Sequence, residues 1–165
     1  MKRNTFEAPP VEADFELFAD TLCEADRVEL ATIAGIKKKD LKEALTGYFR
    51  SSFECYTLVD NESLKPIALF GCVSKEMEYE AEGTNKLVVG HPWLLSNGDL
   101  ELYPKEVMQL AKYYIKERWA PYFSYLHVMA SEDHPYSIPF LKKIGFKQDT
   151  QVNLPNIKGT VLIYV

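Results

Sequence analysis

The spacing of hydrophobic residues in this 165-residue chain changes at about residue 52. Before that point, apolar residues recur every three or four positions, which is typical of amphipathic helices. After it, short apolar runs are separated by turn-like segments and by two further helical stretches, which is typical of strands in a mixed sheet. This order of patterns predicts a fold of the α+β class.

The N-terminal third predicts two helical regions. Apolar residues from Phe15 to Ala34 are spaced by three and four, and Gly35 follows as a stop signal, so this stretch predicts one interrupted helix or two short ones. A further helix is predicted over Lys39–Ser51, which carries a clear apolar stripe. A short strand is expected near Phe6.

Three apolar runs predict an antiparallel meander: Phe53–Val59, Ile67–Ser74 and Lys86–Leu95. The turn-like residues Asp60–Ser63 separate the first two runs. The acidic segment Glu76–Asn85 is predicted to be a loop between the second and third runs.

The remaining elements complete a mixed sheet. An amphipathic helix over Pro104–Trp119 and a strand over Tyr125–Ala130 should form a βαβ unit with the third run, with parallel strands. A short helix over Tyr136–Ile144 precedes two final strands, Phe146–Val152 and Thr160–Val165. The predicted architecture is a mixed, mostly antiparallel sheet with one βαβ crossover and flanking helices.

Composition narrows the class of protein. With 47% hydrophobic and 26% charged residues and no linker-like segment, residues 1–165 are expected to form one globular domain. The net charge of −5 argues against nucleic acid as a partner. Apolar stretches such as Pro66–Val73 are too short to span a membrane, and the N-terminus lacks an apolar signal core. Three cysteines without a CxxC pair suggest buried thiols in a reducing compartment, so a soluble cytoplasmic protein is expected.

The order of elements, together with the sequence PFLKKIGF at Pro139–Phe146, resembles the GNAT (Gcn5-related N-acetyltransferase) family. In detail the chain is similar to the GNAT-like proteins of short-tailed bacteriophages, in CEADRVEL (Cys23–Leu30), PWLL (Pro92–Leu95) and SIPFLKKIGF (Ser137–Phe146). That similarity implies an internal virion or assembly protein that contacts a phage structural protein or a host protein. It would then be found in the cytoplasm of the infected cell or in the virion.

The resemblance also implies where acetyl-CoA would bind. GNAT enzymes hold its pyrophosphate with backbone amides in a turn patterned Q/R-x-x-G-x-G/A at a helix N-terminus. The corresponding stretch here, Leu95–Leu102, has a single glycine, lacks a preceding Arg or Gln and carries Asp99 and Glu101. This departure favours a degenerate acyl-CoA site, so acetyl-CoA is expected only if the protein is active. The candidate cofactor-binding residues are Leu94, Leu95, Ser96, Asn97 and Gly98.

Two side chains are candidates for catalysis. GNAT enzymes often place a tyrosine general acid at the position of Leu141, which cannot donate a proton, and Tyr136 is the nearest substitute. His91 lies on the third run, and its ordinary pKa suits a general base near neutrality. The alternatives are a packed or partly exposed Tyr136 and a hydrogen-bonded His91 beside Trp93.

Other kinds of site find little support. His91, His127 and His134 do not have the spacing of metal ligands, so no metal is predicted. The sequence contains neither the GxSxG motif of α/β-hydrolases nor a P-loop. The basic triplet Lys37–Lys39 is interpreted as a solvated cluster.

Aromatic residues crowd the end of the crossover helix and the strand after it, and one helix cannot bury all of them. They predict either a protein interface or a large core with scattered surface aromatics. The residues are Tyr113, Tyr114, Trp119, Tyr122, Phe123 and Tyr125. Two hypotheses follow: a phage protein that acts through protein contacts, and an atypical N-acyltransferase that uses acetyl-CoA.

Overall fold

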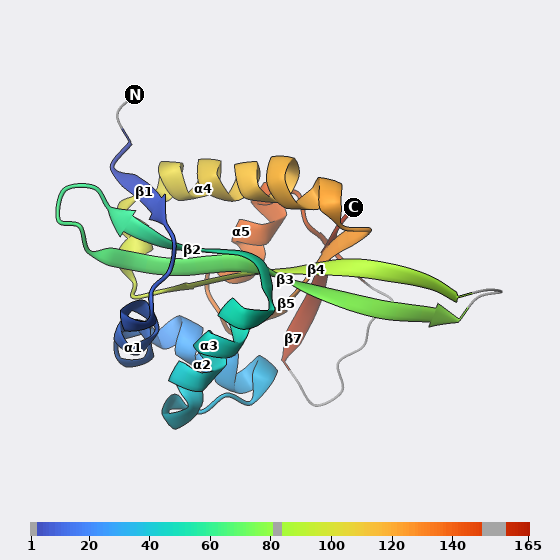
Figure 1. The fold of residues 1–165 in the computed structure, drawn as a ribbon, viewed down its shortest axis with the longest axis horizontal. Coiled ribbons are helices and arrows are strands. Elements are labelled where there is room, and N and C mark those ends of the chain that lie inside the picture. Colours follow the sequence, from blue (N-terminus) through green and yellow to red (C-terminus); the bar gives the residue numbers. More distant parts are fainter. Residues whose placement is uncertain (1–2, 81–83, 150–157) are drawn as a thin grey trace.

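The computed structural model describes residues 3–80, 84–149 and 158–165 (Figure 1). Its α-helices are α1 (Glu12–Thr21), α2 (Glu24–Ala34), α3 (Leu41–Ser51), α4 (Pro104–Tyr113) and α5 (Ser137–Ile144). Short 3-10 turns occupy Lys38–Asp40, Asp99–Leu102 and Ala120–Tyr122, and a π-helical turn, Tyr114–Trp119, extends α4. The strands are β1 (Thr5–Ala8), β2 (Ser52–Asp60), β3 (Pro66–Glu80), β4 (Thr84–Ser96), β5 (Tyr125–Ser131), β6 (Lys147–Gln148) and β7 (Gly159–Tyr164).

Within the described residues, seven strands form one sheet in the order β1-β2-β3-β4-β5-β7-β6. Every neighbouring pair is antiparallel except β4 and β5, which are parallel and joined through α4. The predicted α+β class and the parallel crossover are therefore confirmed.

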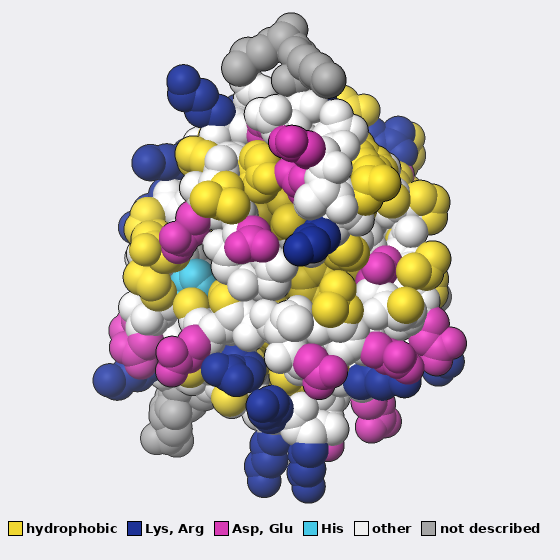
Figure 2. Space-filling view, turned by 90° about the vertical axis from the view of Figure 1, so that its left-hand side faces the viewer, with side chains coloured by type: hydrophobic (Ala, Val, Ile, Leu, Met, Phe, Trp, Pro, Cys, Tyr) yellow, Lys and Arg dark blue, Asp and Glu magenta, His cyan; other side chains and the backbone are white. Residues whose placement is uncertain are grey.

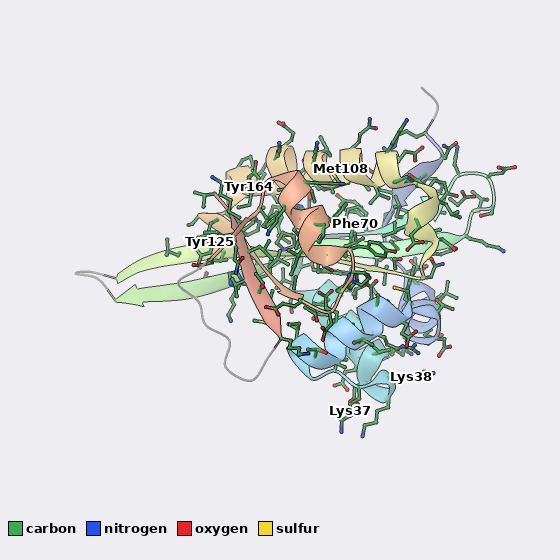
Figure 3. All side chains as sticks on the ribbon, turned by 180° about the vertical axis from the view of Figure 1, so that it is seen from behind. Lys37, Lys38, Phe70, Met108, Tyr125 and Tyr164 are labelled. Carbon is green, nitrogen blue, oxygen red and sulfur yellow. The ribbon has the colours of Figure 1, made fainter. Side chains whose placement is uncertain are left out.

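Helices cover both faces of this sheet (Figure 1). Adjacent residues of β3 point to opposite faces, as a strand requires. Ala68 and Phe70 belong to a core with α4, its π-helical turn and α5, whereas Leu69 belongs to a core with α1, α2 and α3. Phe70 and Met108 lie in facing layers of the first core (Figure 3).

Most predicted elements are found close to their predicted bounds. The stretch Phe15–Ala34 is two helices, α1 and α2, separated by Leu22 and Cys23. The predicted helix over Pro104–Trp119 is α-helical only as far as Tyr113. Of the predicted strand Phe146–Val152, only Lys147–Gln148 is a strand, and its last three residues lie outside the described ranges.

The predicted loop over Glu76–Asn85 is wrong where the structure describes it. β3 continues to Glu80 and β4 begins at Thr84, so these strands form a long hairpin that extends beyond the body of the sheet (Figure 1). The sequence alternates glutamate with Met77 and Tyr79, a period of two that suits a strand. The high glutamate content obscured that alternation.

Gly90 lies in the last residue pair between β4 and β5. A Cβ atom at Gly90 would lie 2.7 Å from side-chain atoms of both Phe123 and Leu126, too close for an ordinary contact. Only a residue without a side chain fits there without displacing these neighbours. No helix among the described residues is long and apolar enough to cross a membrane.

Candidate functional site

The parallel strands β4 and β5 pair over only two positions and then separate. The pairs are Val89 with Tyr125 and Gly90 with Leu126, and the Ser124 amide also donates to the Val88 carbonyl. Beyond them, the described residues of β4 and β5 form no further pairs. We call the space between the diverging strands the opening. It is bounded on one side by β4 from Gly90 to its end, and on the other side by β5 from Leu126 to its end.

Backbone groups along a strand point alternately to either side, so every second residue of β4 faces the opening. The Val88 carbonyl faces β5. The Ser96 amide binds Asp26 of α2 and the Ser96 carbonyl binds the Cys23 amide just before α2, so neither bonds to β3. Pro92 and Leu94 share this alternation. Proline has no amide hydrogen. Of these two residues, therefore, Leu94 is the one that presents an N–H group to the opening.

His91 and His127 are the first residues past the last β4–β5 pair, and we call this the near end of the opening. The rings lie edge to face, with centroids 5.0 Å apart. His91 Nδ1 is 3.1 Å from the main-chain oxygen of His127 and 3.2 Å from its Nδ1. Burial lowers the pKa of both histidines, so both favour the neutral form.

Two carboxylates of α2 hold the ends of both strands, which we call the far end. Asp26 Oδ2 accepts the Ser96 amide at 2.8 Å, and Glu29 Oε1 accepts the Ser131 amide at 2.7 Å. The Cys23 amide also donates to the Ser96 carbonyl, at 2.8 Å. Helix α2 therefore ties the ends of β4 and β5 together on one face of the sheet.

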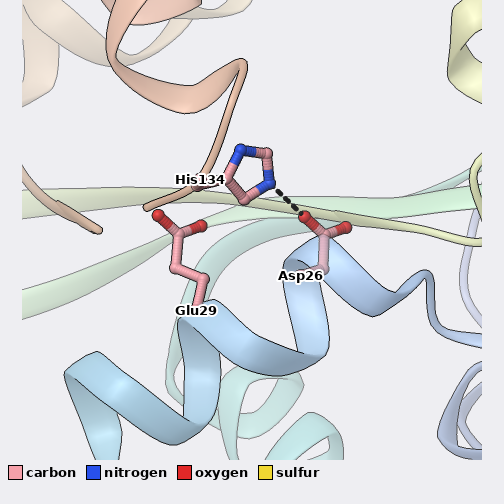
Figure 4. Close-up of side chains that lie close together, drawn as sticks. All are labelled: Asp26, Glu29 and His134. Atoms are coloured by element: carbon pink, nitrogen blue, oxygen red, sulfur yellow. Dashed lines mark hydrogen bonds and ion pairs between the residues drawn. The ribbon is translucent and has the colours of Figure 1, made fainter. Parts of the chain in front are cut away.

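His134 completes this network from the loop between β5 and α5 (Figure 4). Its Nε2 lies 3.0 Å from Asp26 Oδ1, and its Nδ1 accepts the amides of Tyr136 and Ser137. Because Nδ1 accepts, the ring hydrogen is on Nε2, which donates to Asp26. This hydrogen bond raises the pKa of His134, whereas the two amides oppose a proton on Nδ1.

The far end has the composition of a metal site, but its histidine directs an N–H group, not an electron pair, toward the carboxylates. One ligand atom from each of Asp26, Glu29 and His134 lies within 4.8 Å of the others. The hydrogen on His134 Nε2 leaves no electron pair there for an ion. Glu29 already accepts from Ser131 and from the Ser137 hydroxyl, and burial raises its pKa. The cluster acts as a hydrogen-bonded brace between α2 and the two strand ends.

The turn after β4 contains the cofactor candidates Asn97 and Gly98. Gly98 has a φ of +100°, which favours glycine, and its amide donates to the Ser96 hydroxyl at 2.9 Å. The Asp99 amide donates to Asn97 Oδ1 at 2.9 Å, and the Asn97 amide donates to the Ile67 carbonyl at 3.3 Å. Three consecutive amides that could bind phosphate oxygens therefore already have acceptors within the chain.

The other candidates are widely separated. Leu95 is buried in the core beneath α1 and α3, so its side chain cannot contact a ligand. Tyr136 precedes α5 and is 61% exposed, with its ring beside His134. Leu141 packs partly buried against the core under α5. His91 and Leu94 lie along the opening, whereas Tyr136 lies beside the brace at its far end.

Two grooves lie away from the opening. One, of about 710 Å³, runs between α1 and the start of α3 and is lined by Glu16, Asp20, Lys38, Lys39 and Lys42, with Ala19. Lys37 and Lys38 point away from the body there (Figure 3). The other groove, of about 480 Å³, lies between β1 and α4.

The aromatic cluster divides between core and surface. Tyr114, Trp119 and Phe123 are buried, whereas Tyr113 and Tyr122 are 50% and 63% exposed. Tyr122 contacts Phe53, which is also exposed, with ring centroids 5.4 Å apart. Apolar side chains also gather on the side of the molecule shown in Figure 2, above a band of charged residues.

Sequence reasoning did not identify Asp26, Glu29 or His127 as parts of this region. Asp26 and Glu29 are three residues apart, a spacing that puts both on one helix face, so a pair of acids could have been noticed. His127 could not have been paired with His91, because their contact depends on the register of parallel strands.

Comparison with known proteins supports the fold. No protein-family model and no curated protein sequence matches the chain. The structure of AAC(6')-Ib with ribostamycin and coenzyme A matches with a TM-score of 0.67 at 15% identity, covering 98% of this chain and 93% of that one. A GNAT-family acetyltransferase from Bacillus anthracis matches with a TM-score of 0.58 at 12% identity, covering 98% and 93%.

A spermidine N-acetyltransferase chimera from Vibrio cholerae and hSSAT matches with a TM-score of 0.60 at 9% identity, covering 98% of this chain and 95% of that one. These matches extend over nearly the whole chain and agree with the fold predicted from the order of elements. The chain has the fold of the GNAT acetyltransferases.

Proposed function

We propose that the chain is an atypical N-acyltransferase that transfers an acetyl group from acetyl-CoA to an amine in the opening between β4 and β5. The supporting observation is the separation of these strands directly after Gly90. The alternation of backbone groups along β4 then directs the Leu94 amide to the opening. Solved structures with this fold include complexes with coenzyme A and acetyl-CoA.

The reaction needs few groups from the protein. One proton of the substrate ammonium passes to His91 Nε2, which is buried and is reached only when the opening widens around the substrate. The amine nitrogen then attacks the thioester carbonyl carbon. The Leu94 amide donates to the carbonyl oxygen as negative charge develops there. The carbon–sulfur bond breaks, and the second proton of the nitrogen passes to the departing thiolate. A tyrosine at the position of Leu141 is not required, because positioning supplies much of the rate.

The residues fit the two ends of acetyl-CoA unequally. The thioester end meets an amide donor and a neutral histidine. The diphosphate end meets a turn whose amides at Asn97, Gly98 and Asp99 already have acceptors, with the carboxylates of Asp99 and Glu101 beside it. Like charges repel, so weak cofactor binding is expected.

Calorimetry with acetyl-CoA tests the proposal. A submillimolar Kd, with transfer to an amine that is lost in His91→Asn, is expected. Removing the turn charges in the double variant Asp99→Asn, Glu101→Gln should tighten binding severalfold. Glu117→Gln, at the opposite end of the crossover helix and exposed, should leave the Kd unchanged. Silence at millimolar acetyl-CoA would rule out the enzyme.

A second candidate function is action through protein contacts, with the acyl-CoA site degenerate. The occupied turn amides and the exposed pair Phe53 and Tyr122 favour it. The similarity to GNAT-like proteins of short-tailed phages implies a phage structural protein or a host protein as the partner, in virion assembly or infection.

This candidate is tested by the amount of the protein in purified virions. The double variant Phe53→Ser, Tyr122→Ser should lower it severalfold, whereas Val28→Ser, an exposed position on α2, should not. Unchanged incorporation of the double variant would contradict an interface at this pair.

A further inference from the structure

The near end of the opening contains a buried side-chain atom whose hydrogen-bonding capacity is not used. His91 Nε2 is shielded from water and is the buried side-chain nitrogen or oxygen that has no hydrogen-bond partner within the described residues. An unpaired buried polar atom destabilises a protein by about 1–3 kcal/mol. Such an atom needs a physical explanation, and a catalytic role is one of those that native proteins show.

The contacts of His91 Nδ1 determine what Nε2 can do. The main-chain oxygen of His127, at 3.1 Å, can only accept a hydrogen bond, so Nδ1 must carry the ring hydrogen. The Nδ1 atom of His127, at 3.2 Å, can accept the same hydrogen if its own hydrogen is on Nε2. A neutral His91 with its hydrogen on Nδ1 has a free electron pair on Nε2.

We infer that His127 is a positioning residue that fixes the tautomer and ring direction of His91, so that Nε2 of His91 is the atom that accepts the substrate proton. The inference rests on the proposed function for the identity of that proton donor. His127 supplies two acceptors, one from the main chain and one from the ring, and both bind one N–H group. It therefore orients the His91 ring through these two contacts.

A neutral orienting partner has a different effect from a carboxylate. A carboxylate would favour protonated His91. Here burial lowers the pKa of His91 most, the His127 ring and Lys75 lower it further, and the hydrogen bond to the His127 main-chain oxygen only partly offsets them. Lys75 also disfavours protonation of His127, and Asp149 favours it. Burial dominates for both rings, so His91 stays unprotonated at neutral pH and can act as a base without first losing a proton.

Nitrogen NMR of the ¹⁵N-histidine-labelled protein at pH 7.5 tests the inference without any substrate. The His91 spectrum should show a protonated Nδ1 and an unprotonated Nε2, the minor tautomer of a free imidazole in water. A hydrogen on Nε2 of His91 in the wild-type protein would overturn the inference, whether or not the protein proves to be an enzyme.

Two substitutions of His127 separate positioning from mere packing. In His127→Asn the side-chain oxygen can take the place of Nδ1 as acceptor, whereas His127→Leu retains only the main-chain oxygen. Asn should keep the His91 tautomer, and Leu should produce a mixture of tautomers. Equal spectra for the two variants would show that the ring of His127 does not set the tautomer.

If acetyl transfer is observed, kcat in His127→Leu should fall about tenfold, part of the roughly 10²–10⁴ that a general base contributes, with the KM for acetyl-CoA unchanged. His127→Asn should restore most of kcat. A protein that has the expected tautomer but shows no transfer would refute the proposed function and leave the positioning of His91 intact.

Discussion

The two ends of the opening differ in how their polar groups are satisfied. At the far end, carboxylates of α2 and His134 form a network in which both carboxylates and both ring nitrogens have partners. At the near end, His91 and His127 share one hydrogen, and His91 Nε2 has no partner among the residues that the structure describes. The far end is therefore built for stability, and the near end retains a reactive atom.

The far end should give the largest loss of stability. Asp26→Ala leaves the Ser96 amide and His134 Nε2–H buried without their acceptor, and we expect it to lower the free energy of unfolding by about 3 kcal/mol. Urea denaturation measures this loss. Asp20→Ala, an exposed acid on α1, should change stability by at most about 0.5 kcal/mol. Equal effects of the two substitutions would refute the brace.

The next effect tests how tightly the near end is packed. Gly90→Ala places a Cβ atom 2.7 Å from atoms of Phe123 and Leu126 and should destabilise the fold by about 2 kcal/mol. In contrast, Gly47→Ala on α3 meets open space and should stabilise by up to about 1 kcal/mol, because alanine favours a helix. Thermal unfolding of both variants provides the comparison, and a neutral Gly90→Ala would contradict the close approach of the strands.

The third effect is a dependence of near-end stability on pH. Burial lowers the pKa of His91 and His127 below 6.5, so below pH 6.5 the unfolded chain binds more protons than the folded one. Their contribution to stability is complete above pH 6.5 and is lost as the pH falls through their folded pKa values. Urea midpoints at pH 7.5 and 5.5 should differ more in the wild type than in the His91→Asn, His127→Asn double variant. An identical pH response would contradict the shifted pKa values.

The smallest effect comes from Glu29→Gln. The side-chain oxygen of glutamine can still accept the Ser131 amide, and its NH₂ group can donate to the Ser137 hydroxyl, so the brace survives. A change of about 0.5 kcal/mol or less in unfolding free energy is expected, measured beside Asp26→Ala. A loss as large as that of Asp26→Ala would show that the charge of Glu29, and not its acceptor atoms, supports the far end.

Local patterns predicted the order of elements and the parallel crossover, because each helix and most strands carry their own hydrophobic period. The long hairpin was partly missed, since the glutamates around Met77 and Tyr79 gave that segment the composition of a loop. His91 and the turn at Gly98 were selected from sequence. The brace was not, because it joins Asp26 to His134 across 108 positions of sequence, and only the fold brings them together.

Gly90, which has no side chain, belongs to the last residue pair before the two strands diverge. Phe123 and Leu126 fill the room that a side chain at Gly90 would need, so the site of divergence is encoded by packing as much as by backbone pairing. A side chain at Gly90 would displace Phe123 and Leu126, and with them the place where any ligand could enter.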